Sequence, residues 1–397
     1  MKMISILGST GSIGRNSLSV ISSLDKGFKI FGLSCHKNTA LLYEQIKTYK
    51  PQYAVITNLD SYQSFVKDFG TKIGESKILF GSDGLNVISS SQNVTTVIVA
   101  IVGFSCIHPV ISAIEQNKTI LIANKEILVS AGNIIISSLK KSKAFILPID
   151  SEHNALLQVI LSSGLEYKIN DDDYYKTKIK NLIITASGGP FIDCKYNDLK
   201  KVTSKEATQH PTWRMGRKIS VDSSTMMNKG LEIIEAKMLF NLDIDNITAL
   251  IHRQSKIHAL VEFFDGTVIS HMSNPDMRIP ISYAITYPER TYNYTSNDFL
   301  YDDFSFDKVP YEKFPCYRLA RKVAEIGKNS GLILNAANEI SVEYFLEDRI
   351  SYLDIPCVIE DVLDTSEIYD HNDIDSITAN DNEIRELTKN CIKTKYS

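Results

Sequence analysis

Ile4-Ser5-Ile6-Leu7-Gly8-Ser9-Thr10-Gly11-Ser12-Ile13-Gly14 is the stretch that decides the fold, an apolar run that leads directly into a glycine-rich segment. Apolar residues with helical spacing follow from Leu18 to Leu24. A strand, a tight turn and a helix in this order can bind a dinucleotide, because glycines admit the pyrophosphate and the helix start offers N–H groups to it. The glycines are spaced three apart rather than in the common G-x-G-x-x-G pattern, so a tight turn without a ligand is the alternative.

The second predicted strand, residues 28–33, indicates which dinucleotide binds. NAD sites usually place an acid at the end of this strand to bind the ribose 2′-hydroxyl. Here the strand leads into Ser34-Cys35-His36-Lys37-Asn38, which holds a cation and no acid. This favours NADP(H), with a solvated Lys37 as the alternative.

Alternating short strands and helical segments continue to about residue 150 and predict a doubly wound, Rossmann-like parallel sheet in an α/β protein. Further strands are expected at 53–56, 77–80, 96–102, 119–122 and 145–149. The run at 96–102 is almost wholly apolar, which is typical of a strand buried on both faces. Ligands of such sheets bind at the carboxyl ends of the strands, where Asn124-Lys125-Glu126 and Asp150-Ser151-Glu152 lie.

Asp150 and Glu152 follow an apolar strand directly. If the backbone stays extended there, side chains two apart point the same way, and both carboxylates converge. Paired carboxylates suit hard divalent cations such as Mg²⁺ or Mn²⁺. A third carboxylate, Glu232, is available further along the chain. Solvated or helix-capping acids are the alternative.

Residues 151–287 are predicted to form a central α+β catalytic domain with a hairpin of strands 257–264 and 267–272 around Asp265-Gly266. Two of its clusters suit a phosphate: Ser187 with its following glycines, and Ser223-Ser224 with Asn228-Lys229, expected at the start of a helix. Helical spacing places Glu232 one turn beyond Asn228 and Lys229. The alternatives are helix caps and a solvated Lys229–Glu232 pair.

The segment from His210 to Gly216 contains Trp213, the only tryptophan of the chain. It predicts a mobile lid near 207–217, with core packing of Trp213 as the alternative. Residues 288–314 are expected to be a linker, and residues 315–397 a C-terminal helical bundle with helices at 317–326, 331–346, 355–363 and 382–391.

The composition of the sequence argues against several classes of protein. The 397 residues allow two or three domains, and a net charge of −4 without a basic stripe argues against nucleic acid. No apolar run approaches the roughly 20 residues that span a bilayer. The first strand begins at residue 3, so no leader peptide is expected. Six scattered cysteines without a C-x-x-C pair indicate reduced thiols and a cytoplasmic location.

Taken together, these motifs resemble the 1-deoxy-D-xylulose 5-phosphate reductoisomerase family. The resemblance spans the chain and rests on seven segments: 8–14, 123–126, 150–152, 186–191, 210–216, 222–235 and 331–339. One departure is His36, where the family usually has glycine, and it affects the adenosine-phosphate pocket.

The resemblance implies a homodimer that rearranges a small phosphorylated sugar and reduces it with NADPH, using Mg²⁺ or Mn²⁺, with Co²⁺ also able to serve. The implied metal ligands are Asp150, Glu152 and Glu232. The residues implied to contact the substrate are Lys125, Ser151, Glu152, Ser187, His210, Trp213, Ser223, Asn228, Lys229 and Glu232. The residues implied to be catalytic are Lys125, Asp150, Glu152, His210 and Glu232. The residues implied to line the cofactor are Thr10, Gly11, Ser12, Ile13, His36, Lys37, Asn38, Asn124, Glu126 and Gly216.

Two other functions fit parts of the pattern. A semialdehyde dehydrogenase-like oxidoreductase of a phosphorylated substrate needs a cysteine nucleophile, for which Cys106 is the candidate. A non-catalytic NADPH-sensing module would not need the acids Asp150, Glu152 and Glu232.

Overall fold

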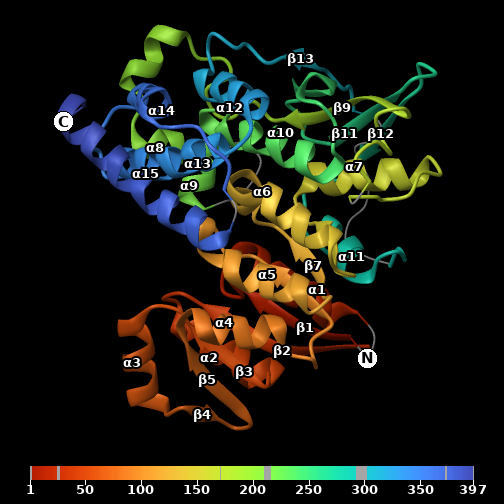
Figure 1. The fold of residues 1–397 in the computed structure, drawn as a ribbon, viewed down its shortest axis with the longest axis vertical. Coiled ribbons are helices and arrows are strands. Elements are labelled where there is room, and N and C mark those ends of the chain that lie inside the picture. The colour runs from red at the N-terminus through yellow and green to blue at the C-terminus, as the bar shows by residue number, and fades with distance from the viewer. Residues whose placement is uncertain are drawn as a thin grey trace. The chain divides into compact units, whose positions relative to one another are not determined.

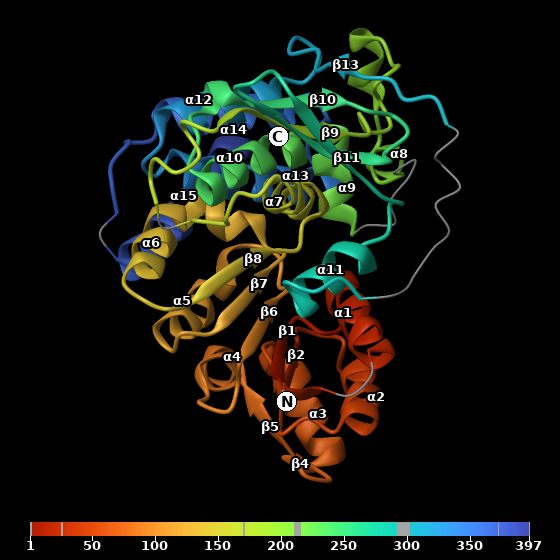
Figure 2. The same ribbon diagram turned by 90° about the vertical axis from the view of Figure 1, so that its right-hand side faces the viewer.

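The computed structural model describes residues 2–24, 27–169, 171–209, 216–291, 302–371 and 373–396. The chain forms two compact units, shown from two sides in Figures 1 and 2. Unit 1 comprises Met1–Ile127, Ile135–Asn154 and Asp276–Thr295, and unit 2 comprises Leu128–Ile134, Ala155–Pro275 and Ser296–Ser397. The domain boundaries at residues 150, 287 and 314 stay a prediction.

Unit 1 is built on a sheet with the strand order β4-β5-β3-β2-β1-β6-β7-β8. All neighbours are parallel except β4 and β5, so the predicted doubly wound sheet is confirmed. The strands are β1 (Lys2–Leu7), β2 (Phe28–Cys35), β3 (Tyr53–Ile56), β4 (Lys72–Ile73), β5 (Ser76–Phe80), β6 (Thr96–Val99), β7 (Thr119–Ile122) and β8 (Phe145–Pro148).

Helices cover both faces of this sheet. Figure 2 shows α1 and α2 on one side and α4 and α5 on the other. The helices of unit 1 are α1 (Ser12–Ser23), α2 (Thr39–Tyr49), α3 (Leu59–Phe69), α4 (Gly81–Ser90), α5 (Ile107–Glu115) and α11 (Arg278–Thr286), while α6 (Lys125–Lys140) and α7 (Ser151–Ser162) contribute residues to both units.

Strand β6 is shorter than the predicted 96–102. It ends at Val99, and Val102 is 56% exposed, so the apolar run continues past the sheet. Apolar character alone did not mark the end of the strand, because exposed valines are common on protein surfaces.

Unit 2 contains a second sheet with the order β12-β11-β9-β10-β13. Strands β9 and β10 are parallel, and the other pairs are antiparallel. The predicted hairpin is confirmed as β11 and β12, which pair from Ile257 and Met272 to Glu262 and Val268. The strands are β9 (Ile179–Ala186), β10 (Ile247–Ile251), β11 (Ile257–Phe263), β12 (Val268–Met272) and β13 (Asp307–Lys308).

The C-terminal helices pack around α13, as the helical prediction required. Helix α13 is buried over most of its length and contacts α12, α14 and α15, a group drawn in blue in Figure 1. The helices of unit 2 are α8 (Ser204–Ala207), α9 (Arg217–Ser224), α10 (Met227–Phe240), α12 (Pro315–Ile326), α13 (Ser330–Leu346), α14 (Asp354–Thr365) and α15 (Ile374–Lys395).

Helix α15 is longer than the predicted 382–391. It begins after Asp373, whose carboxylate accepts a hydrogen bond of 2.7 Å from the Ser376 N–H. Its first turns are polar and therefore lacked the apolar period that identifies a helix in sequence.

Among the described residues, no helix combines the length and apolar character needed to cross a membrane.

The β1–α1 turn depends on a close approach between backbone segments. A Cβ at Gly14 would meet the Gly8 carbonyl oxygen and lie 2.5 Å from Ser9 Cα, so only glycine fits. Gly8 has φ +89°, and its N–H donates to Ser34 Oγ at 2.8 Å. Glycine at these positions therefore sets the path of the chain from strand to helix.

We predict that Gly14→Ala destabilises the protein by about 1–3 kcal/mol, the usual cost of forcing extra atoms into a packed site. Denaturant unfolding without cofactor measures the change. Gly11→Ala is the matched control, because a Cβ there would lie 3.4 Å from its nearest neighbour, the Gly8 carbonyl oxygen. Equal stability of the two variants would contradict the argument.

Candidate active site

The β1–α1 turn presents backbone N–H groups at the start of α1. Gly11 is the N-cap residue and makes no side-chain cap, and Gly11 and Ser12 are exposed while Thr10 and Ile13 are half-buried. The N–H groups of a first helical turn have no partner within their helix. They can therefore receive an anionic group such as a pyrophosphate.

The loop after β2 holds three residues predicted to line the cofactor, of which Lys37 was predicted to meet the 2′-phosphate. Asn38 caps α2 by accepting a hydrogen bond of 3.2 Å from the Leu41 N–H. His36 Nδ1 lies 2.9 Å from Thr57 Oγ1, and the Lys37 side chain is exposed. The side chains of His36 and Asn38 thus shape the loop. The Lys37 ammonium is left at the surface, and residues 34–38 contain no acid that could pair with it.

Asn124 shapes the turn between β7 and α6. Its carboxamide is 1% exposed, accepts from the Ile127 N–H at 3.0 Å and donates to the Ile101 and Gly103 carbonyl oxygens at 2.5 and 2.7 Å. The adjacent Cys106 thiol is fully buried, and burial raises its pKa to about 12. Because the thiolate is the nucleophile, a protonated and inaccessible Cys106 does not suit the semialdehyde dehydrogenase-like alternative.

The extended backbone expected for Asp150-Ser151-Glu152 is wrong. Helix α7 begins at Ser151, and the Asn154 N–H donates to the Asp150 carbonyl at 2.9 Å, so Glu152 lies in a first helical turn. The Lys125 ammonium lies 2.5 Å from the Asp150 carboxylate, with both side chains mostly buried, and Ser151 Oγ donates to Glu152 at 2.5 Å. The helix dipole favours an acid at the start of a helix, so the acids at 150 and 152 also indicate a helix start.

In unit 2, the Ser187 loop packs directly against the end of α9. Gly189 has φ +67°, and a Cβ on it would lie 2.7 Å from the Ser223 carbonyl oxygen. Ser223 and Ser224 lie in the last turn of α9, so their predicted place at a helix start is wrong. Met226, with φ 61°, separates them from α10, which begins at Met227. The two predicted phosphate clusters are therefore neighbours. The Ser187 loop follows β9, whereas Ser223 lies at the end of α9 and Asn228 at the start of α10.

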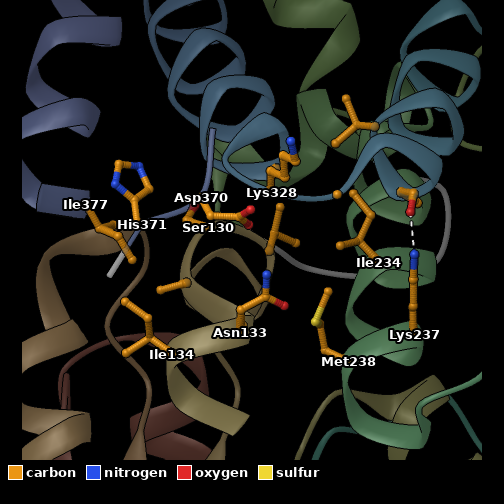
Figure 3. Close-up of a pocket in the computed structure, with 17 residues that line it drawn as sticks. Ser130, Asn133, Ile134, Ile234, Lys237, Met238, Lys328, Asp370, His371 and Ile377 are labelled. Carbon is orange, nitrogen blue, oxygen red and sulfur yellow. Dashed lines mark hydrogen bonds between the residues drawn. The ribbon is translucent and has the colours of Figure 1, made fainter. Parts of the chain in front are cut away.

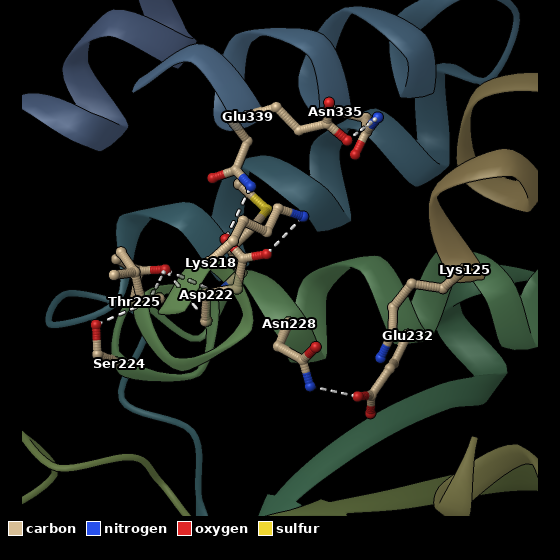
Figure 4. Close-up of polar contacts among 12 residues, drawn as sticks. Lys125, Lys218, Asp222, Ser224, Thr225, Asn228, Glu232, Asn335 and Glu339 are labelled. Atoms are coloured by element: carbon tan, nitrogen blue, oxygen red, sulfur yellow. Dashed lines mark hydrogen bonds and ion pairs between the residues drawn. The ribbon is translucent and has the colours of Figure 1, made fainter. Parts of the chain in front are cut away.

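Helix α10 carries the predicted Asn228, Lys229 and Glu232 one turn apart (Figure 4). Asn228 Nδ2 donates to Glu232 Oε1 at 2.5 Å, and the Lys229 ammonium pairs with Glu232 Oε2. The Lys229 and Glu232 side chains are only 4% and 1% exposed, so the alternative of a solvated pair is wrong. A carboxylate buried in this way is stable only when it is paired.

Asp222 is a residue that sequence reasoning missed. Its carboxylate is 2% exposed, lies 2.8 Å from the Lys218 ammonium and accepts from Asn338 Nδ2 at 2.9 Å (Figure 4). The Tyr352 hydroxyl donates to the Ser224 carbonyl at 2.7 Å. These contacts hold α9 against the C-terminal helices. An acid four residues after a lysine, followed by serines at a helix end, was the available signal.

Two predicted residues, His210 and Trp213, lie outside the described residues, so the lid stays a prediction. Gly216 is described and is the N-cap of α9.

We predict that Lys218→Met lowers the free energy of unfolding by about 1–3 kcal/mol, because it leaves the buried Asp222 carboxylate with one charged donor fewer. Denaturant unfolding at neutral pH is the measurement. Lys47→Met removes the exposed pair with Glu44, 3.1 Å apart, and should cost about 0–1 kcal/mol. A loss at Lys218 no larger than this control would show that the Asp222 contacts contribute little.

Comparison with known proteins places the whole chain in one family. Residues 4–132 match the family model described as 1-deoxy-D-xylulose 5-phosphate reductoisomerase. Residues 146–240 match the model of the C-terminal domain of that enzyme, and residues 272–387 match a model described as the DXP reductoisomerase C-terminal domain.

Two relatives of that name cover nearly the full length. The protein of Wigglesworthia glossinidia brevipalpis is 43% identical over 99% of this chain and 100% of its own, and that of Nitrosomonas eutropha is 40% identical over 100% and 95%. A solved structure of DOX-P reductoisomerase with NADPH, fosmidomycin and magnesium has a TM-score of 0.93 at 36% identity, covering 100% of both chains. The enzyme from Zymomonas mobilis with NADPH has a TM-score of 0.87 at 34% identity, covering 98% of each. The chain therefore belongs to the 1-deoxy-D-xylulose 5-phosphate reductoisomerase family.

Proposed function

We propose that this protein converts 1-deoxy-D-xylulose 5-phosphate into 2-C-methyl-D-erythritol 4-phosphate, using NADPH and a divalent cation, in non-mevalonate isoprenoid precursor biosynthesis. The observation that carries the proposal is the end-to-end match to the solved reductoisomerase that binds NADPH, fosmidomycin and magnesium. The reaction rearranges the linear ketose phosphate to a branched aldehyde, which then accepts hydride from NADPH at its carbonyl carbon and a proton at its oxygen.

The cofactor is proposed to lie along the carboxyl ends of the unit 1 strands. Backbone N–H groups of residues 10–13 would receive the pyrophosphate, because they stand at the start of α1. The exposed Lys37 ammonium would meet the 2′-phosphate, for which the acid-free loop leaves room. His36, Asn38, Asn124, Glu126 and Gly216 complete the proposed lining.

The proposed metal ligands are Asp150, Glu152 and Glu232, with Mg²⁺ or Mn²⁺ preferred. Three carboxylates are a donor set that fits a hard divalent cation. Asp150 and Glu232 each already pair with an ammonium group in their own unit, so each carboxylate is held in place and a metal ion would share or displace that pairing. When bound, the ion supplies Lewis-acid stabilisation of the charge that develops on substrate oxygens.

Phosphate binding is proposed for Ser187, Ser223, Asn228, Lys229 and His210. The packing of the Gly189 loop against Ser223 supports this grouping, because it brings the loop that carries Ser187 next to Ser223. Lys125 and Ser151 would orient substrate oxygens, and Trp213 would cover the site. A phosphate held in this way fixes the reacting carbons, which lowers the entropic part of the barrier.

A homodimer in the cytoplasm is part of the proposal. Strand β12 is an edge of the second sheet. Its first residue, Val268, is 50% exposed, and Phe264 in the preceding turn is 59% exposed, which supports pairing with a second copy there. Light scattering should give twice the chain mass, and Val268→Lys should yield monomer.

The exposed thiol of Cys357 fits a reducing compartment.

The direct test is an NADPH-oxidation assay with 1-deoxy-D-xylulose 5-phosphate, with Mg²⁺ and after chelation. Oxidation that needs both the ketose phosphate and the metal supports the proposal. NADPH binding without turnover would instead support the sensing module.

For the metal site, we predict that Glu232→Gln lowers turnover by at least about a hundredfold, because the amide keeps the shape of the side chain and removes its charge. Steady-state assays over a range of Mg²⁺ concentrations measure the effect. Glu386→Gln, in the exposed pair with Lys389, is the control and should behave as wild type. Near-normal turnover of Glu232→Gln would remove Glu232 from the ligand set.

For cofactor choice, we predict that Lys37→Ala raises the Michaelis constant for NADPH about tenfold or more, because a hydrogen bond to a charged group contributes about 1.5–3 kcal/mol. The constant for NADH should hardly change, since NADH lacks the 2′-phosphate. Lys29→Ala, at an exposed position early in the same strand, is the control. Equal effects on both cofactors would show that Lys37 does not contact the 2′-phosphate.

A further inference from the structure

Unit 2 contains a cavity of about 140 Å³ that involves none of the residues proposed above for substrate, metal or cofactor. Its walls come from α6, α10, the junction of α12 and α13, and three residues nearer the C-terminus, Asp370, His371 and Ile377 (Figure 3). An engineered apolar cavity of similar volume in another protein holds a benzene molecule. The space therefore fits an aromatic ring of about six non-hydrogen atoms, and the other atoms of a ligand would extend to the open rim.

The buried wall of this cavity carries a hydroxyl that lacks a partner. Ser130 is 6% exposed, and its Oγ makes no hydrogen bond with any described residue. Helical serines usually donate to a carbonyl one turn back, as Ser17 and Ser89 do at 2.9 and 2.7 Å. A buried polar group without a partner has lost its hydrogen bonds to water and gained none in return. A ligand atom that reaches Ser130 would restore one such hydrogen bond.

Close packing keeps the cavity open. Helix α6 is kinked at Ala131 (φ −134°, ψ 19°), immediately after Ser130. A Cβ on Gly331 of α13 would collide with the Val129 carbonyl oxygen, and one on Gly132 would lie 2.7 Å from Met238 Sδ of α10. Because α10 and α13 hold the kinked turn from two sides, the wall cannot relax to fill the space or to satisfy Ser130 from within the helix.

The exposed rim carries charge, and the inner walls are apolar. Lys328, with φ 54°, and Asp370 are exposed lining residues, and neither makes an ion pair within the described part of the chain. The Lys237 ammonium on α10 adds a second cation and donates to the Ala324 carbonyl at 2.5 Å. Buried Ile234 and Val323 supply apolar surface. Two cations against one acid leave a net charge of about +1 at this lining.

We propose that this cavity is a binding site for a small organic monoanion with a compact apolar body. Its acid group would pair with Lys328 at the rim, its body would cover the surface of Ile234 and Val323, and a second polar atom would bond the Ser130 hydroxyl. Asp370 would disfavour a second negative charge on the ligand. The bound molecule would contact α6 and α10, the helices that also carry Lys125 and Glu232.

The probe is 4-hydroxybenzoate, because its carboxylate, ring and hydroxyl match the three parts of the site. Isothermal titration is performed on the holoenzyme with NADPH, Mg²⁺ and fosmidomycin present, so that the proposed active site is already occupied. Saturable binding with a Kd of about 1 mM or tighter is expected for ten non-hydrogen atoms. The neutral 4-hydroxybenzamide should bind about tenfold more weakly.

Three variants locate the site. Ser130→Ala should weaken binding about fivefold and Lys328→Asn about tenfold, as expected for the loss of one neutral and one charged hydrogen bond, whereas Asp370→Asn should strengthen it. Asparagine is used at Lys328 because it tolerates a positive φ. Lys50→Asn is the matched control, since Lys50 also has a positive φ (47°) and lies in unit 1. Thermal unfolding of each variant verifies that it is folded.

The proposal is overturned if wild type shows no saturable binding up to about 10 mM, or if the amide binds as tightly as the acid. It is also overturned if folded Ser130→Ala and Lys328→Asn bind the probe as wild type does.

Discussion

The buried carboxylate of Glu232 is the constraint on which much of unit 2 depends. At 1% exposure it needs charged and polar partners, and Lys229 and Asn228 supply them from the preceding turn of the same helix. The pairing works only if α10 is helical from Met227 onward, which fixes its first turn beside the end of α9. A divalent cation at Glu232 would compete with the Lys229 ammonium for the carboxylate. If Glu232 binds the proposed metal ion, Lys229 and Asn228 therefore also influence the affinity for that ion.

Much of the fold could be predicted because unit 1 uses signals that are local. Its strands are short apolar runs in the sequence, and β1, β2 and β7 lie at the positions of those runs. Errors arose where local signals compete. Asp150-Ser151-Glu152 can be an alternating strand end or a helix start, and the acidic first turn decides for the helix. The polar first half of α15 carries no apolar period, so its helix was found only in part.

The contacts that hold the candidate site residues in place could not be predicted from the sequence. Asn338 and Asp222 are 116 positions apart, and no spacing rule joins them. The same is true of the Tyr352 hydroxyl, which bonds the Ser224 carbonyl. Ser223 was placed on the wrong helical terminus because only two residues, Thr225 and the left-handed Met226, separate α9 from α10. Backbone conformations of that kind are uncommon for methionine and leave little trace in a sequence.

These distant contacts explain why the C-terminal helices matter to a site that they do not line. Asn338 lies on α13, the most buried helix of its group, so the position of α9 depends on the packing of α13 against α12, α14 and α15. The Gly189 loop in turn rests on the end of α9. Loosening the helical core would therefore displace Ser223 and the loop of Ser187 together. A core substitution in α13 should act on substrate affinity through this chain of contacts as well as on stability.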